Sequence, residues 1–450
     1  MLVYMDKIFG IMTDVAQYRE KLNQAVLQSD VVKIFENLLT IAVEDWASDI
    51  HIEPLENYSR IRIRIDWVLE ELIQYPKHLH ESIISKFKIE SGQMRPDEKR
   101  LPQDARISNV TQANKEIDLR ANTLPTVWWE KLVMRIVDKS KDIPLLSELG
   151  IEWSNKQIIE TYLKYPNWII LNTWPTWSGK TTTLYACLTE VNTPEVNIIT
   201  YEDPVENKVP WLNQAQIRAD IWFTFANWLR GWLRQDPDII MVWEIRDGET
   251  LDMAMESAMT WHLVFSTVHT NSAVETITRV LNLWAKAFMI VGTFNLVIAQ
   301  RLCRANCKRC KSRISIKWDK RLEYIKESFR NFDKEALERE IISRWITKEQ
   351  RNDFINEWYI YMWTWKDPET WWTCSVCWWS GYKGRLGIFE MMPYNDEIKT
   401  MLLEWKQAFE IEKVALKSGM INLERDWVFK VIKWFLNMDQ VFKFVKWKSF

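Results

Sequence analysis

The fold of this chain is decided by the stretch Ile169-Ile-Leu-Asn-Thr-Trp-Pro-Thr-Trp-Ser-Gly-Lys-Thr181. A short aliphatic run, a loop and then helix-forming residues make the strand–loop–helix unit of a phosphate-binding loop, whose pattern is G-x-x-x-x-G-K-[ST]. The last three residues of the stretch match the second half of that pattern. Trp174 stands where the pattern requires its first glycine, and Trp177 stands where related loops carry another.

Tryptophan at these two positions contradicts the chemistry of the loop. A phosphate-binding loop turns successive backbone N–H groups toward the phosphates, which requires special φ angles and leaves no room for a Cβ atom. A bulky side chain is strongly disfavoured wherever φ must be positive. Either the loop is inactive, or these two letters do not represent tryptophan.

The composition favours the second explanation. The chain has 28 tryptophans and 11 glycines, whereas glycine averages ~7% of the residues in soluble proteins. The two residue types together make 39 positions, an ordinary total for glycine alone. Tryptophan also occupies turn-like places, such as Trp128-Trp129 and Asp426-Trp427, where glycine is usual. We hypothesise that the gene uses UGA for glycine and that these codons are written here as tryptophan.

The alternative is a protein with genuine tryptophans that fill cores or stack on ligands, each burying about 150–250 Å². That alternative predicts tryptophans placed within the periodicity of helices and strands. Many of them lie between the periodic segments instead. We therefore prefer the codon hypothesis.

Length and composition indicate a globular protein of two or three domains. The chain has 450 residues, of which 47% are hydrophobic and 27% charged, and domains average ~100–200 residues. The net charge of −2 gives no indication of nucleic-acid binding. No apolar run approaches the ~18 residues of a membrane span, and the N-terminus lacks a signal-peptide pattern. We expect a cytoplasmic protein that meets a membrane only through partners.

The sequence predicts five segments along the chain. Ser59 to Asp66 alternates basic and aliphatic residues, as a half-buried strand does. Between 141 and 305, short aliphatic runs alternate with helical patterns, which is typical of a parallel α/β sheet. Lys320 to Glu340 is highly charged, which predicts solvated helices. The predicted segments are an N-terminal segment 1–30, an α/β domain 31–140, an α/β core 141–305, a cysteine-containing module with a charged helical insertion 306–384, and a helical region 385–450.

With glycine at 174 and 177, the loop predicts a site for a nucleoside triphosphate and Mg²⁺. Lys180 would bridge the β- and γ-phosphates as a point charge, and the Thr181 hydroxyl would ligate Mg²⁺. The complete set of predicted phosphate-binding residues is Trp174, Pro175, Thr176, Trp177, Ser178, Gly179, Lys180, Thr181 and Thr182.

Three further strand ends supply polar groups to the same site. Glu244 comes directly after an apolar strand, and the carboxyl ends of parallel strands face the nucleotide, so Glu244 is the candidate for polarising the attacking water. Glu202 and Asp203 would hold metal-bound water, and His269 would sense the γ-phosphate. Taken alone, Glu244 could equally be a surface acid and His269 a core or capping residue.

Four motifs in this order resemble those of the secretion ATPase superfamily, and specifically the assembly ATPases of type II secretion and type IV pili. The Walker A, Asp box, Walker B and His box of that family are similar to 174–181, 199–206, 233–247 and 261–271. The resemblance covers roughly residues 30–450, Ala47–Pro54 included. It implies an α/β fold with a RecA-like P-loop ATPase core, a smaller PAS-like α/β N-terminal domain and a zinc-binding insertion.

The resemblance also implies catalytic residues and partners. Arg100 and Arg106 would reach the nucleotide of a neighbouring subunit in a ring, by resemblance a homo-hexamer, with ATP and Mg²⁺ as cofactors. The partner would be an inner-membrane platform protein, the location its cytoplasmic face, and no nucleic acid is implied. Ten tryptophans fall where the family usually has glycine: Trp46, Trp67, Trp129, Trp168, Trp174, Trp177, Trp243, Trp261, Trp284 and Trp427.

Four of the six cysteines form two C-x-x-C pairs, Cys307 with Cys310 and Cys374 with Cys377. Two such pairs can surround Zn²⁺ with four sulfur ligands, although the gap between them is longer than in common zinc ribbons. The resemblance strengthens the prediction, because the assembly members carry a tetracysteine zinc module here and the retraction members lack it. Disulfides are the alternative, which a cytosolic location disfavours.

Three functions follow from these patterns. The first is an ATP-hydrolysing motor of type IV pilus assembly or type II secretion. The second is a catalytically inactive homologue with a structural or interaction role, which applies if the tryptophans are real. The third is a pilus-retraction or conjugation ATPase, against which the tetracysteine motif argues.

The codon hypothesis makes a direct prediction. We expect the codons at 174 and 177 to be UGA, and peptides of the native protein to carry the mass of glycine at both positions. Sequencing the gene and mass spectrometry of the native protein check this. UGG codons, or the indole mass at either position, would refute the hypothesis.

Overall fold

The computed structural model describes residues 17–65, 68–112, 115–138, 143–173, 179–217, 231, 234–318, 320–328, 359–363, 374, 377 and 380–438. The chain divides into two compact units, one within Met1–Asp142 and the other within Ile143–Phe450. Each unit has a hydrophobic core of its own. The finer division into five segments stays a prediction.

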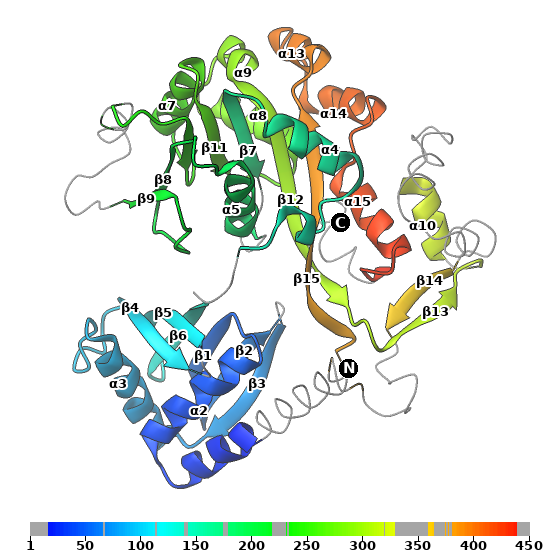
Figure 1. Ribbon diagram of the computed structural model, residues 1–450. Helices are drawn as coiled ribbons and strands as arrows, with labels where there is room; N and C mark the ends of the chain where they lie inside the picture. Colours follow the sequence, from blue (N-terminus) through cyan, green and yellow to red (C-terminus); the bar gives the residue numbers. More distant parts are fainter. Residues whose placement is uncertain are drawn as a thin grey trace. The chain divides into compact units, whose positions relative to one another are not determined.

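The first unit is a six-stranded antiparallel sheet with the strand order β3-β2-β1-β6-β5-β4, packed against two main helices (Figure 1). The predicted strand at 59–66 is confirmed: Ile61 and Ile63 are buried in the core, while Arg62 between them stays partly exposed. The elements are α2 (Val31–Glu44), β1 (Asp49–Pro54), β2 (Ser59–Ile65), β3 (Val68–Tyr75), η1 (Lys77–Leu79), α3 (His80–Ser91), β4 (Gln103–Gln112), β5 (Lys115–Pro125) and β6 (Glu130–Asp138).

The second unit is built on a seven-stranded sheet with the order β15-β12-β7-β11-β10-β8-β9. Its strands are parallel, except that β15 is antiparallel to β12 at one edge. This arrangement confirms the predicted α/β core. The strands are β7 (Trp168–Thr173), β8 (Ile198–Glu202), β9 (Asn213–Gln216), β10 (Ile239–Val242), β11 (Leu263–Val268), β12 (Phe294–Asn306) and β15 (Tyr382–Pro393), and a separate pair is β13 (Lys311–Ser315) with β14 (Tyr359–Trp363).

Helices cover the second sheet, so its central strands are buried on both sides (Figure 1). Every residue of β10 and β11 is buried, as expected of a parallel sheet covered on both faces. Among the described helices, none combines the length and apolar composition that crossing a bilayer requires. The helices are η2 (Leu146–Glu148), α4 (Trp153–Tyr162), α5 (Lys180–Val191), α7 (Gly248–Met259), α8 (Ala273–Asn282), α9 (Ala287–Thr293), α10 (Lys320–Ser328), α13 (Asp396–Leu403), α14 (Ala408–Lys417) and α15 (Leu423–Ile432).

Side chains before several of these helices explain where the helices begin. The Asp247 carboxylate accepts the backbone N–H of Thr250 at 2.8 Å before α7, and the Ser272 hydroxyl accepts that of Glu275 at 3.2 Å before α8. Asn422 plays the same part before α15. Such caps satisfy N–H groups that the first helical turn leaves unpaired. They therefore fix the points at which these helices begin.

Many tryptophans adopt a backbone conformation that belongs to glycine. L-residues other than glycine pay about 1–2 kcal/mol for left-handed φ angles, and bulky residues are the least suited to them. Of the nine described non-glycine residues with positive φ, seven are tryptophan, with φ between 58° and 102°. The seven are Trp46, Trp168, Trp211, Trp261, Trp284, Trp405 and Trp434. The backbone at these positions therefore supports the codon hypothesis.

The environment of several tryptophan side chains agrees with this. Trp211 and Trp284 are 91% and 92% exposed, which leaves most of a large apolar surface in water. Trp427 is fully buried, and its indole N–H finds no partner among the described residues. A buried donor without an acceptor costs free energy. Glycine would remove the exposed apolar surface at 211 and 284 and the unpaired indole N–H at 427.

Replacing Trp284 by glycine in the chain as written should raise the free energy of unfolding by about 1 kcal/mol, because glycine accepts its φ of 70° without strain. Urea denaturation followed by circular dichroism measures the change. Trp318→Gly is the matched control, because Trp318 is 95% exposed but does not have a left-handed backbone. Equal effects of the two substitutions would contradict the argument.

Candidate nucleotide and metal sites

The N-terminus of α5 offers an anion-binding site. Gly179 precedes the helix with a φ of 82°, and a Cβ atom there would lie 3.1 Å from the Leu302 side chain. No side chain among the described residues caps this end, so its N–H groups stay available to an anion. Lys180 and Thr181 are the first two residues of the helix and are partly buried, and Thr182 is exposed. The predicted residues Trp174, Pro175, Thr176, Trp177 and Ser178 lie outside the described residues.

The carboxyl ends of the parallel strands bring three predicted residues together beside α5. Glu244 follows β10, and His269 follows β11, the neighbouring strand. The Nε2 atom of His269 lies 3.1 Å from Oε1 of Glu244, and Nζ of Lys180 lies 4.0 Å from Oε2 of the same carboxylate. Glu244 thus stands between a helix N-terminus and a histidine, which is where a carboxylate could orient a nucleophile.

The charges around Glu244 keep it ionised. Burial favours its neutral form, but the hydrogen bond from Arg246 and the charges of His269 and Lys180 outweigh burial and hold the pKa of Glu244 below its ordinary value. Burial also lowers the pKa of Lys180, and the charges of Glu244 and Glu206 oppose that change. Glu244 is therefore an acceptor at neutral pH. A carboxylate of this kind can take a hydrogen bond from water but cannot donate one.

Arg246 belongs to this cluster, although the sequence analysis assigned it no role. Its guanidinium lies 3.1 Å from Glu244 and 3.9 Å from Asp203. The hydrogen bond with Glu244 raises the pKa of Arg246. Its position two residues after Glu244 was the available signal, because side chains two apart in an extended segment point the same way.

Glu202 faces the interior of the protein. Its carboxylate accepts hydrogen bonds from the hydroxyl of Tyr185, from Thr200 at 2.7 Å and from the amide of Gln214 at 3.0 Å, and it is fully buried. Its partner Tyr185 lies in α5, so this contact joins the helix to the end of β8. Asp203, half exposed, is the carboxylate of the pair that faces Arg246. The role of Glu202 in holding metal-bound water stays a prediction.

The two predicted arginines lie in the first unit and differ in their surroundings. Arg106 in β4 donates to the buried carboxylate of Asp118 in β5 at 2.8 Å. Arg100 is 88% exposed and pairs with Glu98 at 3.1 Å. Arg106 is thus held by the sheet, whereas Arg100 is presented to solvent. Their action on a neighbouring subunit stays a prediction.

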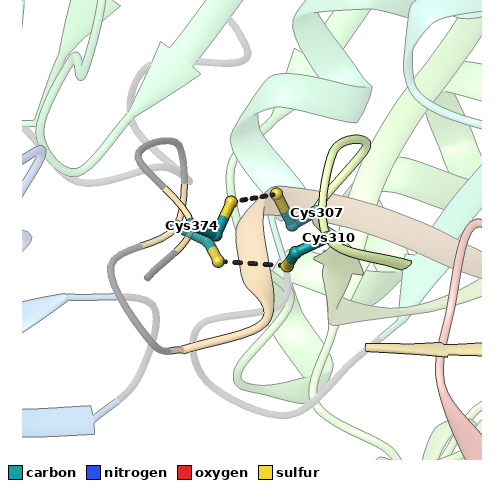
Figure 2. A group of neighbouring side chains, drawn as sticks. Cys307, Cys310 and Cys374 are labelled. Carbon is teal, nitrogen blue, oxygen red and sulfur yellow. Dashed lines mark hydrogen bonds between the residues drawn. The ribbon is translucent and has the colours of Figure 1, made fainter. Parts of the chain in front are cut away.

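The four predicted metal ligands converge at one place. The Sγ atoms of Cys307, Cys310, Cys374 and Cys377 all lie within 4.8 Å of one another, and the four residues are buried (Figure 2). Cys307 lies 3.8 Å from Cys374, and Cys310 lies 3.3 Å from Cys377, measured between sulfur atoms. Zn²⁺ with ~2.3 Å bonds to four sulfurs places them about 3.8 Å apart. The cluster therefore fits a closed tetrahedral zinc site.

Burial disfavours the thiolate form of the cysteines in this cluster unless a cation is bound. Burial raises the pKa of the Cys310 and Cys377 thiols. Thiols are ligands only as thiolates, so a metal is what would hold them deprotonated in this buried place. The remaining cysteines, Cys187 and Cys303, lie in the two hydrophobic cores of the second unit, as expected of small core residues.

Comparison with known proteins places this chain in a family. The family model described as "Type II/IV secretion system protein" matches residues 24–443. The chain is 39% identical over 414 residues to the type IV pilus assembly ATPase PilB of Acinetobacter baylyi, which covers 92% of the chain and 66% of that relative. It is 37% identical over 424 residues to the type II secretion system protein E of Xanthomonas campestris, with 94% and 69% covered.

The fold agrees with this result. The structure of the Legionella pneumophila ATPase DotB superposes with a TM-score of 0.59 at 18% sequence identity, over 90% of this chain and 93% of that one. The chain therefore belongs to the type II/IV secretion system protein family, as the resemblance predicted. It spans about two thirds of the length of the curated relatives, 66% of the Acinetobacter protein and 69% of the Xanthomonas protein.

The zinc site makes a testable prediction. Replacing Cys310 by serine should abolish stoichiometric zinc and lower the melting temperature, because a structural zinc site contributes folding energy directly. Elemental analysis and thermal melting of the purified full chain measure both effects. Cys187→Ala is the control, since Cys187 is buried outside the cluster, and it should keep the zinc. Zinc that survives in Cys310→Ser would contradict the assignment.

Proposed function

We propose that this chain is an ATP-hydrolysing motor of type IV pilus assembly or type II secretion. One observation carries the proposal: Lys180, Glu244 and His269 come together at the carboxyl ends of β7, β10 and β11. That edge is where parallel α/β sheets bind nucleotides. Membership of the secretion family and likeness to pilus assembly ATPases support the same activity.

Each residue of the cluster has a defined task in this proposal. Lys180 binds the β- and γ-phosphates, and the free N–H groups at the start of α5 donate hydrogen bonds to further phosphate oxygens. Glu244 orients the attacking water as a hydrogen-bond acceptor. His269, at 3.1 Å from Glu244, senses whether the γ-phosphate is present.

The residues present fit a nucleotide with Mg²⁺. The Thr181 hydroxyl is a suitable oxygen ligand for the metal, and it lies directly after Lys180. When bound, Mg²⁺ offsets the negative charge of the phosphates. Arg246 forms an ion pair with Glu244 at 3.1 Å. A triphosphate that enters the site would give this guanidinium a second anion with which to pair. The release of Glu244 from Arg246 would then free the carboxylate for water.

A ring of identical subunits is the assembly that suits Arg100 and Arg106. A head-to-tail contact presents the same arginines to the next subunit all around a closed ring, whereas a two-fold dimer does not. We propose a homo-hexamer on this ground and by family resemblance. A platform protein of the inner membrane would be its partner, and the cytoplasmic face of that membrane its location.

Assembly is preferred over retraction because of the cysteine cluster. The four sulfur atoms form a site that fits zinc, and the tetracysteine module characterises the assembly members of the family. Pilus assembly and secretion are not separated by this argument, since relatives of both kinds cover similar parts of the chain. Genomic neighbours that encode pilins or a secretin would decide between them.

The proposed activity predicts two different defects. Lys180→Ala should lose ATP binding, because the phosphates lose their cation. Glu244→Gln should still bind ATP but hydrolyse it about 10²–10⁴-fold more slowly, because an amide is a poor substitute for a carboxylate that orients water. Equilibrium binding of a fluorescent ATP analogue and a phosphate-release assay measure these outcomes on protein made with glycine at the UGA codons.

Glu249→Gln serves as the matched control, since Glu249 is an exposed acid in the first turn of α7 and touches none of the cluster. Normal hydrolysis by Glu244→Gln would refute the role of Glu244. No binding and no hydrolysis by protein made with the native codon assignment would favour the inactive homologue.

A further inference from the structure

We propose that Glu390 is a positioning residue for the nucleotide site, which holds the loop 269–272 in place by tying the start of α8 to the start of α15. This inference rests on the proposed ATPase function. Glu390 lies in β15, far from the P-loop in sequence, and the sequence motifs give it no role. Its side chain is 4% exposed.

The two oxygens of Glu390 bind two different helices. Oε1 accepts the backbone N–H of Ala273 at 2.7 Å, and Oε2 accepts that of Leu423 at 3.3 Å. Ala273 is the first residue of α8 and Leu423 the first residue of α15. One buried carboxylate therefore satisfies an unpaired N–H group at each of two helix N-termini, where the helix dipoles favour a negative charge.

The loop that Glu390 holds is the one that carries His269. Three residues separate His269 from Ala273, and hydrogen bonds fix the segment at both ends. At the β7 side, the N–H of Thr270 donates to the hydroxyl of Thr173 at 3.1 Å, and Thr173 is the last residue before the P-loop segment. At the α8 side, Glu390 provides the anchor. The loop 269–272 is thus anchored to β7 at one end and to β15 at the other.

A carboxylate is needed here, and an amide would not replace it. A glutamine side chain has one accepting oxygen, and its NH₂ group would meet the second N–H donor. Burial raises the pKa of Glu390 to about 7, and the hydrogen bonds from Ala273 and Leu423 oppose that rise. The charged groups that face it are Glu412 of α14, which favours the neutral form, and Arg301 of β12, which favours the carboxylate. Protonation of Glu390 would weaken its hydrogen bonds with the N–H groups of Ala273 and Leu423.

The α15 end of this link contacts α10, a helix of the cysteine-containing module. Leu423 is followed in α15 by Glu424, which accepts hydrogen bonds from Tyr324 and Ser328 of α10, and α10 lies beside α15 (Figure 1). Glu390 links the loop 269–272 to the first turn of α15, and α10 of the charged helical insertion contacts that same turn.

The test compares Glu390→Gln with Glu404→Gln in the full chain, made with glycine at the UGA codons as in the activity assays above; the unaltered chain is this same protein without either substitution. Glu404 is exposed and pairs with Lys406 at 3.8 Å, so it is a matched control outside this network. We expect Glu390→Gln to lower kcat about tenfold with little change in KM, because the phosphate contacts remain while His269 is displaced. The unaltered chain should lose activity as the pH falls through about 7, and Glu390→Gln should lack that step.

Hydrogen–deuterium exchange gives a readout without catalysis. Peptides that span 269–276 should exchange about tenfold faster in Glu390→Gln than in Glu404→Gln, because a buried hydrogen bond is lost. Unchanged exchange and an unchanged pH profile in a folded variant would overturn the proposal. An inactive unaltered chain would instead overturn the proposed function, while the exchange experiment would still decide the role of Glu390.

If Glu390→Gln does not fold, the unaltered chain provides the answer. Its exchange at 269–276, corrected for the intrinsic effect of pH, must become faster as the pH falls through about 7. Protection that stays constant down to about pH 4, below the ordinary pKa of a glutamate side chain, would show that Glu390 does not hold the loop.

Discussion

The parallel pairing of β8, β10, β11 and β7 is the constraint on which the rest of the second unit depends. Parallel strands of a covered sheet end at a common edge, and the side chains that follow them must emerge there together. Val242 pairs with Ser266 and with Tyr201, so Glu244 and the residues after β8 and β11 reach one level. The buried aliphatic strands thereby place charged groups beside α5, where Glu244 pairs with Arg246, His269 and Lys180.

The alternating run at 59–66 predicted one strand of the first sheet, and the aliphatic runs between 141 and 305 predicted the parallel sheet of the second unit. β15 was not predicted, because most of it lies in the segment 385–450, which was expected to be helical. The strand around Ile61 and Ile63 shows period two because one of its faces is buried, and β10 shows a continuous apolar run because both of its faces are. The order of motifs along the chain then predicted which strand ends meet. These features follow from burial, which short segments of sequence record directly.

Side-chain direction beyond a strand end could not be predicted in the same way. Glu202 closes β8 and turns inward to Tyr185, whereas Asp203 next to it faces Arg246. The choice depends on partners from other elements, and the periodicity of one strand carries no information about them. The contact between Ala273 and Glu390 joins residues 117 positions apart, so only the assembled sheet reveals it. Residues 174–178, where the sequence is most informative, lie outside the described structure.

The long pair β12 and β15 has a consequence for the segment that it encloses. β12 ends at Asn306, directly before Cys307, and β15 begins shortly after Cys377, so the cysteine pairs lie just beyond the adjoining ends of two paired strands. The ends of the enclosed segment are therefore brought together by the sheet and by the cysteine cluster, whatever lies between them. The entropy of closing a loop grows only with the logarithm of its length, about 0.6 kcal/mol for each doubling. Natural insertions, or an engineered reporter domain, can therefore lengthen this segment with only a small loss in the free energy of folding.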